Sequence, residues 1–347
     1  MMRSAEEIRA EADRLAWSNN FGTTVVRPPA ARPAEDAVEK ALRPKLLADF
    51  AGQPIARERL EIATGAARLR KRTLEHILLS GPPGLGKTTL ALILANEMGG
   101  ELITTIGPSI NKLGELATLL MTMEPNTILF VDEVHRLSKA TEEFLYPVLE
   151  DGVLDYKVGM KPMRVPLQPF TFIGATTRAG KLSEPMRDRL GLRVVLKTYD
   201  LPDMVRIVQR SANLLKMPLT DAACHLIAKR SRGTPRIANN FLRRLRDYAD
   251  VKAPGQNVTM KLAANALLLE GVDANGLDDL DRRYLRTLVH TYNGGPVGLS
   301  TIAATMDVDT ETLEDAVEPY LLQEEYISRG QGGRRALSKA LATPLTL

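Results

Sequence analysis

The sequence predicts an α/β protein in which a parallel β-sheet with helices on both faces is followed by an all-helical unit and a small winged-helix domain. Three observations predict this class. Short β-rich runs alternate with helical stretches between residues 76 and 196, a pattern typical of parallel sheets. From residue 201 to about residue 270 only helical patterns remain. Two short helical patterns and a hairpin-like segment then close the chain.

The predicted sheet is built from short runs of apolar and β-branched residues. Five such runs are predicted as strands: residues 77–79, 102–106, 127–131, 170–173 and 194–196. Helices are predicted in the gaps between them, for instance over residues 88–98 and 140–149.

The two later units are defined by prolines and glycines. Pro202, Pro218 and Pro235 stand near helix starts in the all-helical unit, and Pro254 with Gly255 marks a break. In the third unit, residues 293–296 (Asn-Gly-Gly-Pro) punctuate helical patterns at 299–306 and 310–322. Residues 326–329 and a glycine-rich turn follow, and a hairpin in this place predicts the wing of a winged-helix domain.

The composition is that of a folded globular chain. Of the 347 residues, 44% are hydrophobic and 25% are charged, which excludes a disordered or collagen-like protein. At roughly 150 residues per domain, this length predicts two or three domains. The single cysteine, Cys224, excludes an intramolecular disulfide framework and favours a reducing compartment, so we expect a cytoplasmic protein.

The first 41 residues are predicted to be a leader that precedes the folded domains. A short amphipathic helix is expected over residues 6–17, and prolines between residues 27 and 33 then interrupt regular structure. Acidic residues occur throughout the opening segment, which lacks the apolar core of an export signal. The longest apolar runs are far shorter than the roughly 18 residues that a membrane helix needs. We therefore expect a mobile arm, no export signal and no membrane span.

A phosphate-binding loop follows the first predicted strand. Residues 81–88 read Gly-Pro-Pro-Gly-Leu-Gly-Lys-Thr and match the GxxxxGK[ST] pattern. Its glycines let backbone N–H groups surround a phosphate, and the start of the next helix adds positive potential. We expect Lys87 to reach the β- and γ-phosphates of a nucleotide and the Thr88 hydroxyl to bind Mg²⁺. A tight turn without a ligand is the alternative, and the strand and helix on either side argue against it.

Two carboxylates end the third predicted strand. The apolar run 128–131 leads directly into Asp132 and Glu133, at the edge of the sheet where ligands bind in parallel α/β folds. Asp132 is expected to hold Mg²⁺ through water, and Glu133 to polarise the attacking water as a general base. Strands often end in acids, so this pair alone is a weak signal. Its position after a phosphate loop makes it a strong indication of a nucleotide-hydrolysing site.

Further polar residues could act on the γ-phosphate. A hydroxyl at the end of the next strand, in the segment that contains Thr177, could orient the water; a simple strand-terminal turn is the alternative. Arg187 and Arg189 lie near the sheet edge and could stabilise phosphoryl transfer, in their own site or in a neighbouring copy's, although a surface pair with Asp188 would also explain them. Arg236 begins a helix of the second unit and could link that unit to bound nucleotide.

Taken together, these residues resemble the AAA+ ATPases and, more closely, the RuvB family of bacterial motors that drive branch migration of Holliday junctions. The resemblance spans residues 42 to 340 and rests on the order and spacing of seven segments: LRPK (42–45), FAGQ (50–53), GPPGLGKTTLA (81–91), DEVHRLSKATEEFLYPVLED (132–151), GATTRAG (174–180), PMRDRLG (185–191) and RSRGTPRIAN (230–239).

The resemblance implies a domain order, an assembly and a cofactor. It predicts a large RecA-like AAA+ domain over 42–200, a helical lid over 201–275 and a winged-helix DNA-binding domain over 276–347, and it leaves the flexible leader expected over residues 1–41 outside. It also implies a homohexameric ring around duplex DNA that uses ATP, yields ADP and requires Mg²⁺.

The resemblance assigns roles to individual residues. Leu42 and Arg43 would contact the adenine nucleotide, and Tyr199 would belong to its pocket. Thr177 would be sensor 1, Arg236 sensor 2, and Arg189 the arginine finger that acts in the neighbouring subunit's site. The loop residues would hold the phosphates and magnesium, with Asp132 and Glu133 as the Walker B pair. The loop residues are Gly84, Gly86, Lys87, Thr88 and Thr89.

Two departures from the family pattern stand out. The finger segment reads RDRLG where RDRFG is usual, and Arg189 itself is kept. The predicted hairpin over residues 154–169 is shorter than in the family, where its apolar tip docks the junction-binding partner RuvA. The tip here offers Val158, Met160, Pro162 and Met163, which could still dock such a partner or could form a solvated loop.

The DNA-binding signal lies in a local run of cations. The net charge of +4 is too small to indicate a nucleic-acid partner by itself. Residues 329–339 nevertheless contain Arg329, Arg334, Arg335 and Lys339 and no acid, with glycines that let a wing tip approach a groove. The resemblance places Arg329 and Arg334 at DNA, while a flexible basic tail is the alternative. The four histidines are scattered and show no metal-ligand spacing.

The sequence thus favours an ATP-hydrolysing DNA motor that drives Holliday junction branch migration in recombination and repair, with duplex DNA, four-way junctions and a RuvA-like protein as partners. A clamp-loader-like or regulatory ATPase that binds DNA without branch migration is the alternative. A non-enzymatic winged-helix regulator is a third hypothesis, and Glu133 and Arg189 argue against it.

Overall fold

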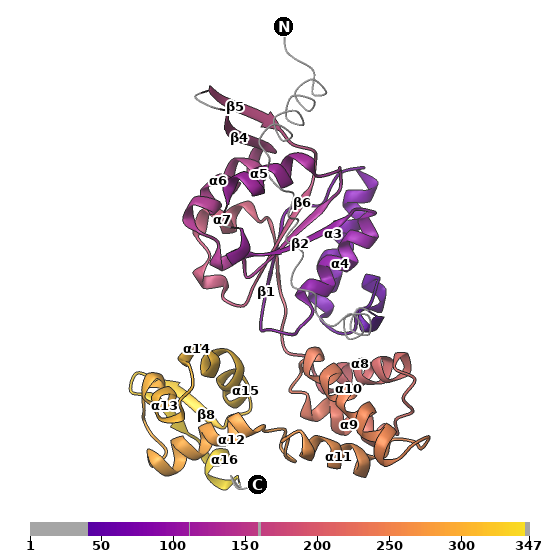
Figure 1. Ribbon diagram of the computed structural model, residues 1–347, viewed down its shortest axis with the longest axis vertical. Coiled ribbons are helices and arrows are strands. Elements are labelled where there is room, and N and C mark those ends of the chain that lie inside the picture. Colours follow the sequence, from indigo (N-terminus) through magenta and orange to yellow (C-terminus); the bar gives the residue numbers. More distant parts are fainter. Residues whose placement is uncertain (1–40, 111, 159–160, 344–347) are drawn as a thin grey trace. The chain divides into compact units, whose positions relative to one another are not determined.

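The computed structural model describes residues 41–110, 112–158 and 161–343 and divides the chain into two units, Met1–Arg43 and Pro44–Leu347 (Figure 1). The elements below belong to the second unit. The predicted leader, with its helix over residues 6–17, lies outside the described residues except for its last position. No described helix is long and apolar enough to cross a membrane.

A five-stranded parallel sheet forms the centre of the first domain, which confirms the predicted fold class. Its strands run in the order β2-β3-β6-β1-β7, and every neighbouring pair is parallel. All five predicted strands are present, β2 with the predicted bounds and the other four with shifted ends: β1 (Ile77–Ser80), β2 (Leu102–Ile106), β3 (Ile128–Asp132), β6 (Thr171–Thr176) and β7 (Leu192–Val195). The ends of β1, β3 and β6 lie side by side at one edge of this sheet.

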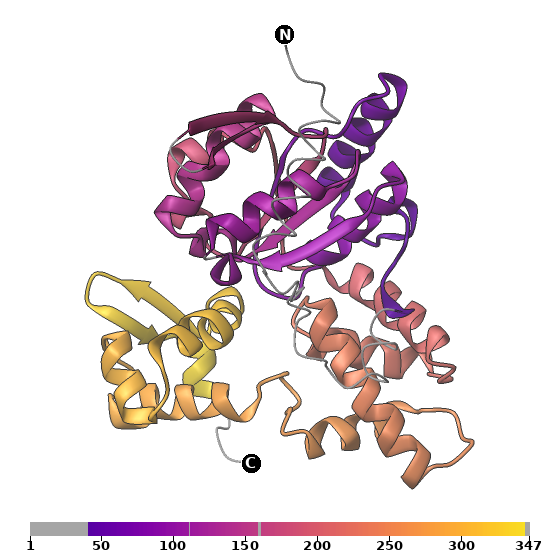
Figure 2. The same cartoon turned by 45° about the horizontal axis from the view of Figure 1, so that its top comes forward.

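Helices cover both faces of the sheet (Figures 1 and 2). Leu79 packs in a core with α3 (Pro54–Leu69) and α4 (Lys87–Met98), whereas its neighbour Leu78 packs in a second core with α5 (Leu113–Thr122) and α6 (Lys139–Asp151). Successive side chains of a strand point to opposite faces, so a sheet covered on both sides needs apolar residues at nearly every position. Shorter elements complete the domain: η1 (Leu47–Asp49), η2 (Gly107–Ser109), η3 (Val134–Arg136), η4 (Ala179–Lys181) and α7 (Glu184–Arg189).

An antiparallel hairpin extends from this domain between α6 and β6. It consists of β4 (Val153–Val158) and β5 (Lys161–Pro166), which confirms that a hairpin forms where the sequence predicts one. Met160 at its predicted tip lies outside the described residues, and of Val158, Pro162 and Met163 the structure describes the backbone.

The next unit is all-helical, as predicted. It contains α8 (Leu201–Leu214), α9 (Asp221–Arg230), α10 (Pro235–Lys252) and α11 (Met260–Leu269). Asp200 and Thr220 cap α8 and α9 by accepting hydrogen bonds from the backbone of Asp203 and Ala223, and a proline stands in the first turn of both α8 and α10.

The C-terminal unit has the helices and the hairpin of a winged-helix domain. Strands β8 (Ile327–Gly330) and β9 (Gly333–Ala336) form the antiparallel wing. Tyr284, Leu288, Ile302 and Leu321 are fully buried in a core of their own, which is why this unit folds around its helices. The remaining elements are α12 (Asp279–Arg286), η5 (Thr287–Thr291), α13 (Leu299–Met306), α14 (Thr310–Thr312), η6 (Leu313–Val317), α15 (Glu318–Gln323) and α16 (Ser338–Ala342).

Candidate active site

The phosphate loop joins β1 to α4, as its motif predicts. Lys87 is the first residue of α4, and its side chain is buried with Nζ donating to the carbonyl oxygens of Gly81 at 2.7 Å and Pro82 at 3.0 Å. Thr88 and Thr89 follow in the same first turn and are half-buried. The first N–H groups of a helix have no partner within it, so this end of α4 can bind anionic groups.

Four charged side chains meet at this loop. Burial lowers the pKa of Lys87, the carboxylates of Asp132 and Glu133 oppose that change, and the Arg236 guanidinium adds to it. Those three partners come from the end of β3 and from the start of α10 in the helical unit. Residues that are far apart in the sequence therefore converge electrostatically on the loop lysine.

The start of α10 packs directly on the loop at Gly84. A Cβ at this glycine would lie 2.8 Å from Cγ2 of Thr234 and 3.0 Å from Cβ of Arg236, and its φ of +79° also disfavours any side chain. The backbone N–H of Arg236 donates to the Gly84 carbonyl at 3.4 Å, while the Arg236 side chain is exposed. Gly84 is therefore required where the helical unit touches the loop.

Tyr199 links the same two parts. Its hydroxyl donates to the carbonyl oxygen of Leu85 at 3.2 Å, and its backbone N–H donates to that of Gly233 at 2.9 Å. Burial raises the pKa of Tyr199, so the phenol keeps its proton at neutral pH and remains a donor. The structure thus places Tyr199 beside the loop. Leu42, which is buried, and Arg43 end the first unit, and their part in nucleotide binding stays a prediction.

Glu133 stands in a tight turn at the end of β3. It adopts φ +50° and ψ +44°, a conformation that is uncommon for a residue with a long side chain, and its N–H donates to Oδ1 of Asp132 at 3.0 Å. Its Oε2 accepts a 3.4 Å hydrogen bond from the Thr177 hydroxyl. Glu133 and Thr177, each predicted as a site residue, are therefore in contact. Backbone strain such as that of Glu133 is often stored at functional sites.

His135 also contacts Glu133, and the sequence analysis missed it. Its Nδ1 lies 3.2 Å from Oε2 of Glu133 and 2.9 Å from Oγ1 of Thr176, and its side chain is 8% exposed. The four histidines show no metal-ligand spacing, and the signal that could have identified His135 is its place two residues after the strand-terminal glutamate. Arg178, also missed, donates two 2.8 Å hydrogen bonds to the carboxylate of Asp315.

Arg189 is held by its own chain at the end of α7. Its Nη2 lies 2.5 Å from Oε2 of Glu150, its Nη1 donates to the carbonyl of Pro185 at 2.9 Å, and its guanidinium lies over the Tyr146 ring at 4.5 Å. These contacts tie Arg189 to α6 and α7. Its predicted action in a neighbouring subunit stays a prediction.

The wing arginines meet a buried acid that the sequence analysis did not foresee. Arg329 and Arg334 both form ion pairs with Glu318, which has no exposed side-chain area, and the Tyr284 hydroxyl donates to it at 2.6 Å. Burial alone would raise the pKa of Glu318, but the hydrogen bonds from Arg334, Tyr284 and Arg329 hold it below its usual value.

Residues 329–339 contain no acid, but in the fold Arg329 and Arg334 have an acid partner from outside this stretch. Lys339 has an acid partner as well, since its Nζ lies 2.8 Å from Oε2 of Glu324. Arg335 stands on β9 opposite Ser328 and is exposed. The acid partners of the wing cations, Glu318 and Glu324, lie in α15 and in the turn after it, outside the stretch 329–339.

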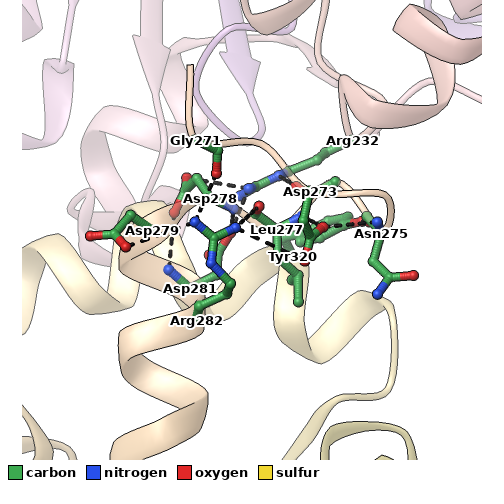
Figure 3. A network of polar contacts seen from close by, with 11 residues as sticks. Arg232, Gly271, Asp273, Asn275, Leu277, Asp278, Asp279, Asp281, Arg282 and Tyr320 are labelled. Carbon is green, nitrogen blue, oxygen red and sulfur yellow. Dashed lines mark hydrogen bonds and ion pairs between the residues drawn. The ribbon is translucent and has the colours of Figure 1, made fainter. Parts of the chain in front are cut away.

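Figure 3 shows a polar network that joins the helical unit to the winged-helix unit. Arg232, just before α10, lies 2.5 Å from Oδ2 of the buried Asp281 in α12 and donates from Nε to the carbonyl of Gly276 at 2.9 Å. The Arg232 guanidinium also lies over the Tyr320 ring at 4.5 Å. The buried Arg282 donates to the carbonyl of Leu277 at 2.8 Å. A network of this kind fixes the two units at their junction.

The chain matches known proteins along nearly its whole described length. Residues 42–196 match the family described as Holliday junction DNA helicase RuvB P-loop domain, residues 199–273 the RuvB AAA lid domain, and residues 274–343 the RuvB C-terminal winged helix domain.

Solved structures give the same result. The chain is similar to Thermotoga maritima RuvB, described as a Holliday junction branch migration motor, with 42% sequence identity and a TM-score of 0.79 over 86% of this chain and 97% of that one. A lysine-to-arginine and an arginine-to-alanine variant of Thermotoga maritima RuvB also align at 42% identity over 86% of this chain and 96% of each variant, with TM-scores of 0.80 and 0.79.

Proposed function

This chain belongs to the RuvB family of Holliday junction DNA helicases, and we propose that it uses ATP hydrolysis at the phosphate loop to drive branch migration of Holliday junctions. The observation that carries the proposal is that the loop with Lys87, the end of β3 with Asp132 and Glu133, and the start of α10 with Arg236 lie at one edge of the sheet, because hydrolysis of a nucleoside triphosphate needs these charges in one place. The P-loop family supports nucleotide binding in general; the roles of individual residues are our proposal.

The residues at the loop suit a magnesium–nucleotide complex. The Thr88 hydroxyl and the Asp132 carboxylate offer oxygen ligands, which Mg²⁺ prefers, and Asp132 is oriented by the N–H of Glu133. Magnesium, when bound, neutralises charge on the phosphates. Lys87 would exchange its loop carbonyls for the β- and γ-phosphates. The phosphates would further rest on the backbone of Gly84, Gly86 and Thr89, and the base and sugar on Tyr199.

Glu133 is the proposed general base. It would take a proton from the water that attacks the γ-phosphorus, while the bond from that phosphorus to the oxygen shared with the β-phosphate breaks and ADP leaves. Thr177 would orient the same water as sensor 1. Arg236 would contact the γ-phosphate from the lid as sensor 2. Loss of the γ-phosphate on hydrolysis would therefore remove a contact at the start of α10.

Movement of the lid would reach the winged helix through Arg232. This residue lies four positions before Arg236 and pairs with the buried Asp281 of α12. A rotation of the lid would therefore carry the winged-helix domain with it, since breaking a buried ion pair is costly. The proposed domain limits are 42–200 for the ATPase, 201–275 for the lid and 276–347 for the winged helix.

We also propose a homohexameric ring in which Arg189 acts in the neighbouring subunit's site. Its pairing with Glu150 occupies one edge of the guanidinium, and that exposed carboxylate would be exchanged for phosphate oxygens at the subunit interface. The wing arginines Arg329, Arg334 and Arg335 would contact the DNA backbone, which suits a motor that moves on any sequence. A protein that acts on chromosomal junctions would work in the cytoplasm.

One experiment separates this function from that of a clamp-loader-like ATPase. A synthetic four-way junction is incubated with the full-length protein and ATP, with and without a RuvA protein, and release of the two duplex products is measured. The proposal predicts ATP-dependent product formation that Lys87→Ala abolishes. ATP turnover stimulated by DNA with no product in either condition would favour the alternative. A product formed only with RuvA would show that this partner is required, as docking on the hairpin around residues 154–169 predicts, and a product formed equally without RuvA would remove that partner from the proposal.

A further inference from the structure

Glu133 is held by two neighbours, and one of them has no role in the function proposed above. Thr177 and His135 both contact the same oxygen, Oε2, at 3.4 Å and 3.2 Å. His135 lies in the short helix η3 directly after Glu133 and is almost fully buried, so its imidazole can move little. A buried imidazole therefore lies in contact with the proposed general base.

The hydrogen positions follow from the partners of His135. A carboxylate only accepts hydrogen bonds, so Nδ1 must carry a hydrogen to make a favourable contact with Glu133. The Oγ1 of Thr176 lies 2.9 Å from Nδ1 and receives the N–H of Arg178 at 2.9 Å; its second lone pair can accept from Nδ1–H. In this tautomer Nδ1–H donates to Thr176 and faces Oε2 of Glu133, 3.2 Å away. The other tautomer would direct a lone pair at the carboxylate.

The charges around His135 favour a neutral ring. Burial is the main cause that lowers the pKa of His135; Glu133 opposes it, whereas Arg178, Lys181 and Arg136 add to it. A neutral imidazole presents its Nδ1–H dipole to the carboxylate 3.2 Å away without supplying a proton that would quench the base. This is the behaviour required of a residue that orients a general base.

We propose that His135 is a positioning residue for Glu133. With Thr177 it fixes Oε2, which leaves Oε1 as the oxygen that takes the proton from the attacking water. A glutamate has three side-chain torsions, and a small misplacement of a catalytic group can cost about 100-fold in rate. The inference rests on the proposed function, because it needs Glu133 to be the general base.

The substitutions His135→Asn and His135→Gln, which are of nearly equal polarity, test whether Nδ1 is the atom that positions Glu133. The asparagine amide nitrogen takes the place of Nδ1, whereas the glutamine amide nitrogen reaches the place of Nε2. Steady-state ATP hydrolysis is measured for the full-length wild type and for His135→Ala, His135→Gln and His135→Asn, together with binding of a non-hydrolysable ATP analogue and the thermal unfolding midpoint. His225→Ala, at an exposed histidine of α9, is the matched control.

The proposal predicts that kcat falls about 10- to 100-fold in His135→Ala and His135→Gln while the KM for ATP and analogue binding hold, and that His135→Asn recovers most of the loss. Wild-type kcat in His135→Ala would overturn it. A loss that follows the unfolding midpoint and is equal in all three variants would also overturn it, because the role would then be structural. Glu133→Gln is measured in parallel: normal turnover in that variant refutes Glu133 as the base, whereas an inactive Glu133→Gln beside an unaffected His135→Ala refutes this inference alone.

Discussion

Arg334 donates from Nε to Oε1 of Glu318 at 2.9 Å, and the side chain of that glutamate has no exposed area. The wing of the DNA-binding domain is thus attached to a carboxylate inside the domain. The same carboxylate holds Arg329 and Tyr284. Glu318 consequently fixes the base of the wing hairpin, and the arginines that the sequence marks for DNA also have a structural task.

Replacing Glu318 should unfold the winged-helix domain more easily. Glu318→Gln removes a buried charge and leaves Arg334 and Arg329 without their partner, so we expect a loss of about 3 kcal/mol in the free energy of unfolding. Denaturant titration measures it. Glu324→Gln is the control, since its 2.8 Å pair with Lys339 is exposed and should contribute at most about 1 kcal/mol. Equal losses in the two variants would contradict the structural role of Glu318.

Arg335 offers the cleaner test of the wing as a DNA contact. It is exposed on β9, whereas Arg334 is 18% exposed and bound to Glu318. Arg335→Ala should weaken duplex binding on every sequence and reduce the slope of log K against log salt by about one. Lys261→Ala, at an exposed lysine of α11, serves as the control in the same fluorescence anisotropy series. An unchanged slope in Arg335→Ala would remove this arginine from the interface.

The proposed action of Arg189 in a neighbouring site predicts complementation. Lys87→Ala and Arg189→Ala should each abolish ATP turnover, the first through the loss of phosphate binding and the second through the loss of the finger. Mixed rings can place an intact Arg189 beside an intact Lys87, so mixing the two inactive proteins should restore part of the turnover. A series of mixing ratios measures it. No recovery at any ratio would show that the two residues serve the same subunit's site.

His76 makes the stability of the ATPase domain depend on pH. Burial lowers its pKa from 6.5 to about 4, and its Nδ1 accepts the N–H of Phe172 at 3.0 Å, an acceptor that protonation destroys. The unfolded chain therefore binds more protons than the folded one between these values, and stability is lost as the pH falls from 6.5 towards 4. The loss should approach about 3 kcal/mol below that window.

Denaturant titrations at several pH values test this. His76→Phe should flatten the dependence between pH 6.5 and 4, at a cost of about 1–3 kcal/mol at neutral pH for the unpaired Phe172 N–H. His225→Gln, at an exposed histidine, is the matched control. An unaltered slope in His76→Phe would assign the acid sensitivity to other groups.

The fold could be predicted because its local signals are strong. A strand buried on both faces is apolar along its buried length, as at residues 128–131 of β3, and the glycines of residues 81–88 adopt the positive φ angles that the loop requires. The strand ends shifted where hydrogen bonding continues through polar residues: β6 runs on to Thr176, beyond the last apolar residue of the predicted run.

The contacts across long sequence distances could not be predicted. Arg232 finds Asp281 49 positions later, and Glu318 receives Arg334 from 16 positions away; no periodicity records either pairing. His135 was missed for a different reason. His135 is close to Glu133 in the sequence, but its orientation depends on Thr176. The parallel pairing of β3 with β6 brings Thr176 beside His135.

The most direct test of the central claim measures ATP turnover and junction branch migration in one reaction, for the wild type and for Glu133→Gln. The variant keeps Lys87 and the loop, so it should still bind nucleotide and DNA. If hydrolysis at this site drives movement, turnover and branch migration should disappear together in Glu133→Gln while binding persists. Branch migration at the wild-type rate by a variant that no longer hydrolyses ATP would contradict the claim.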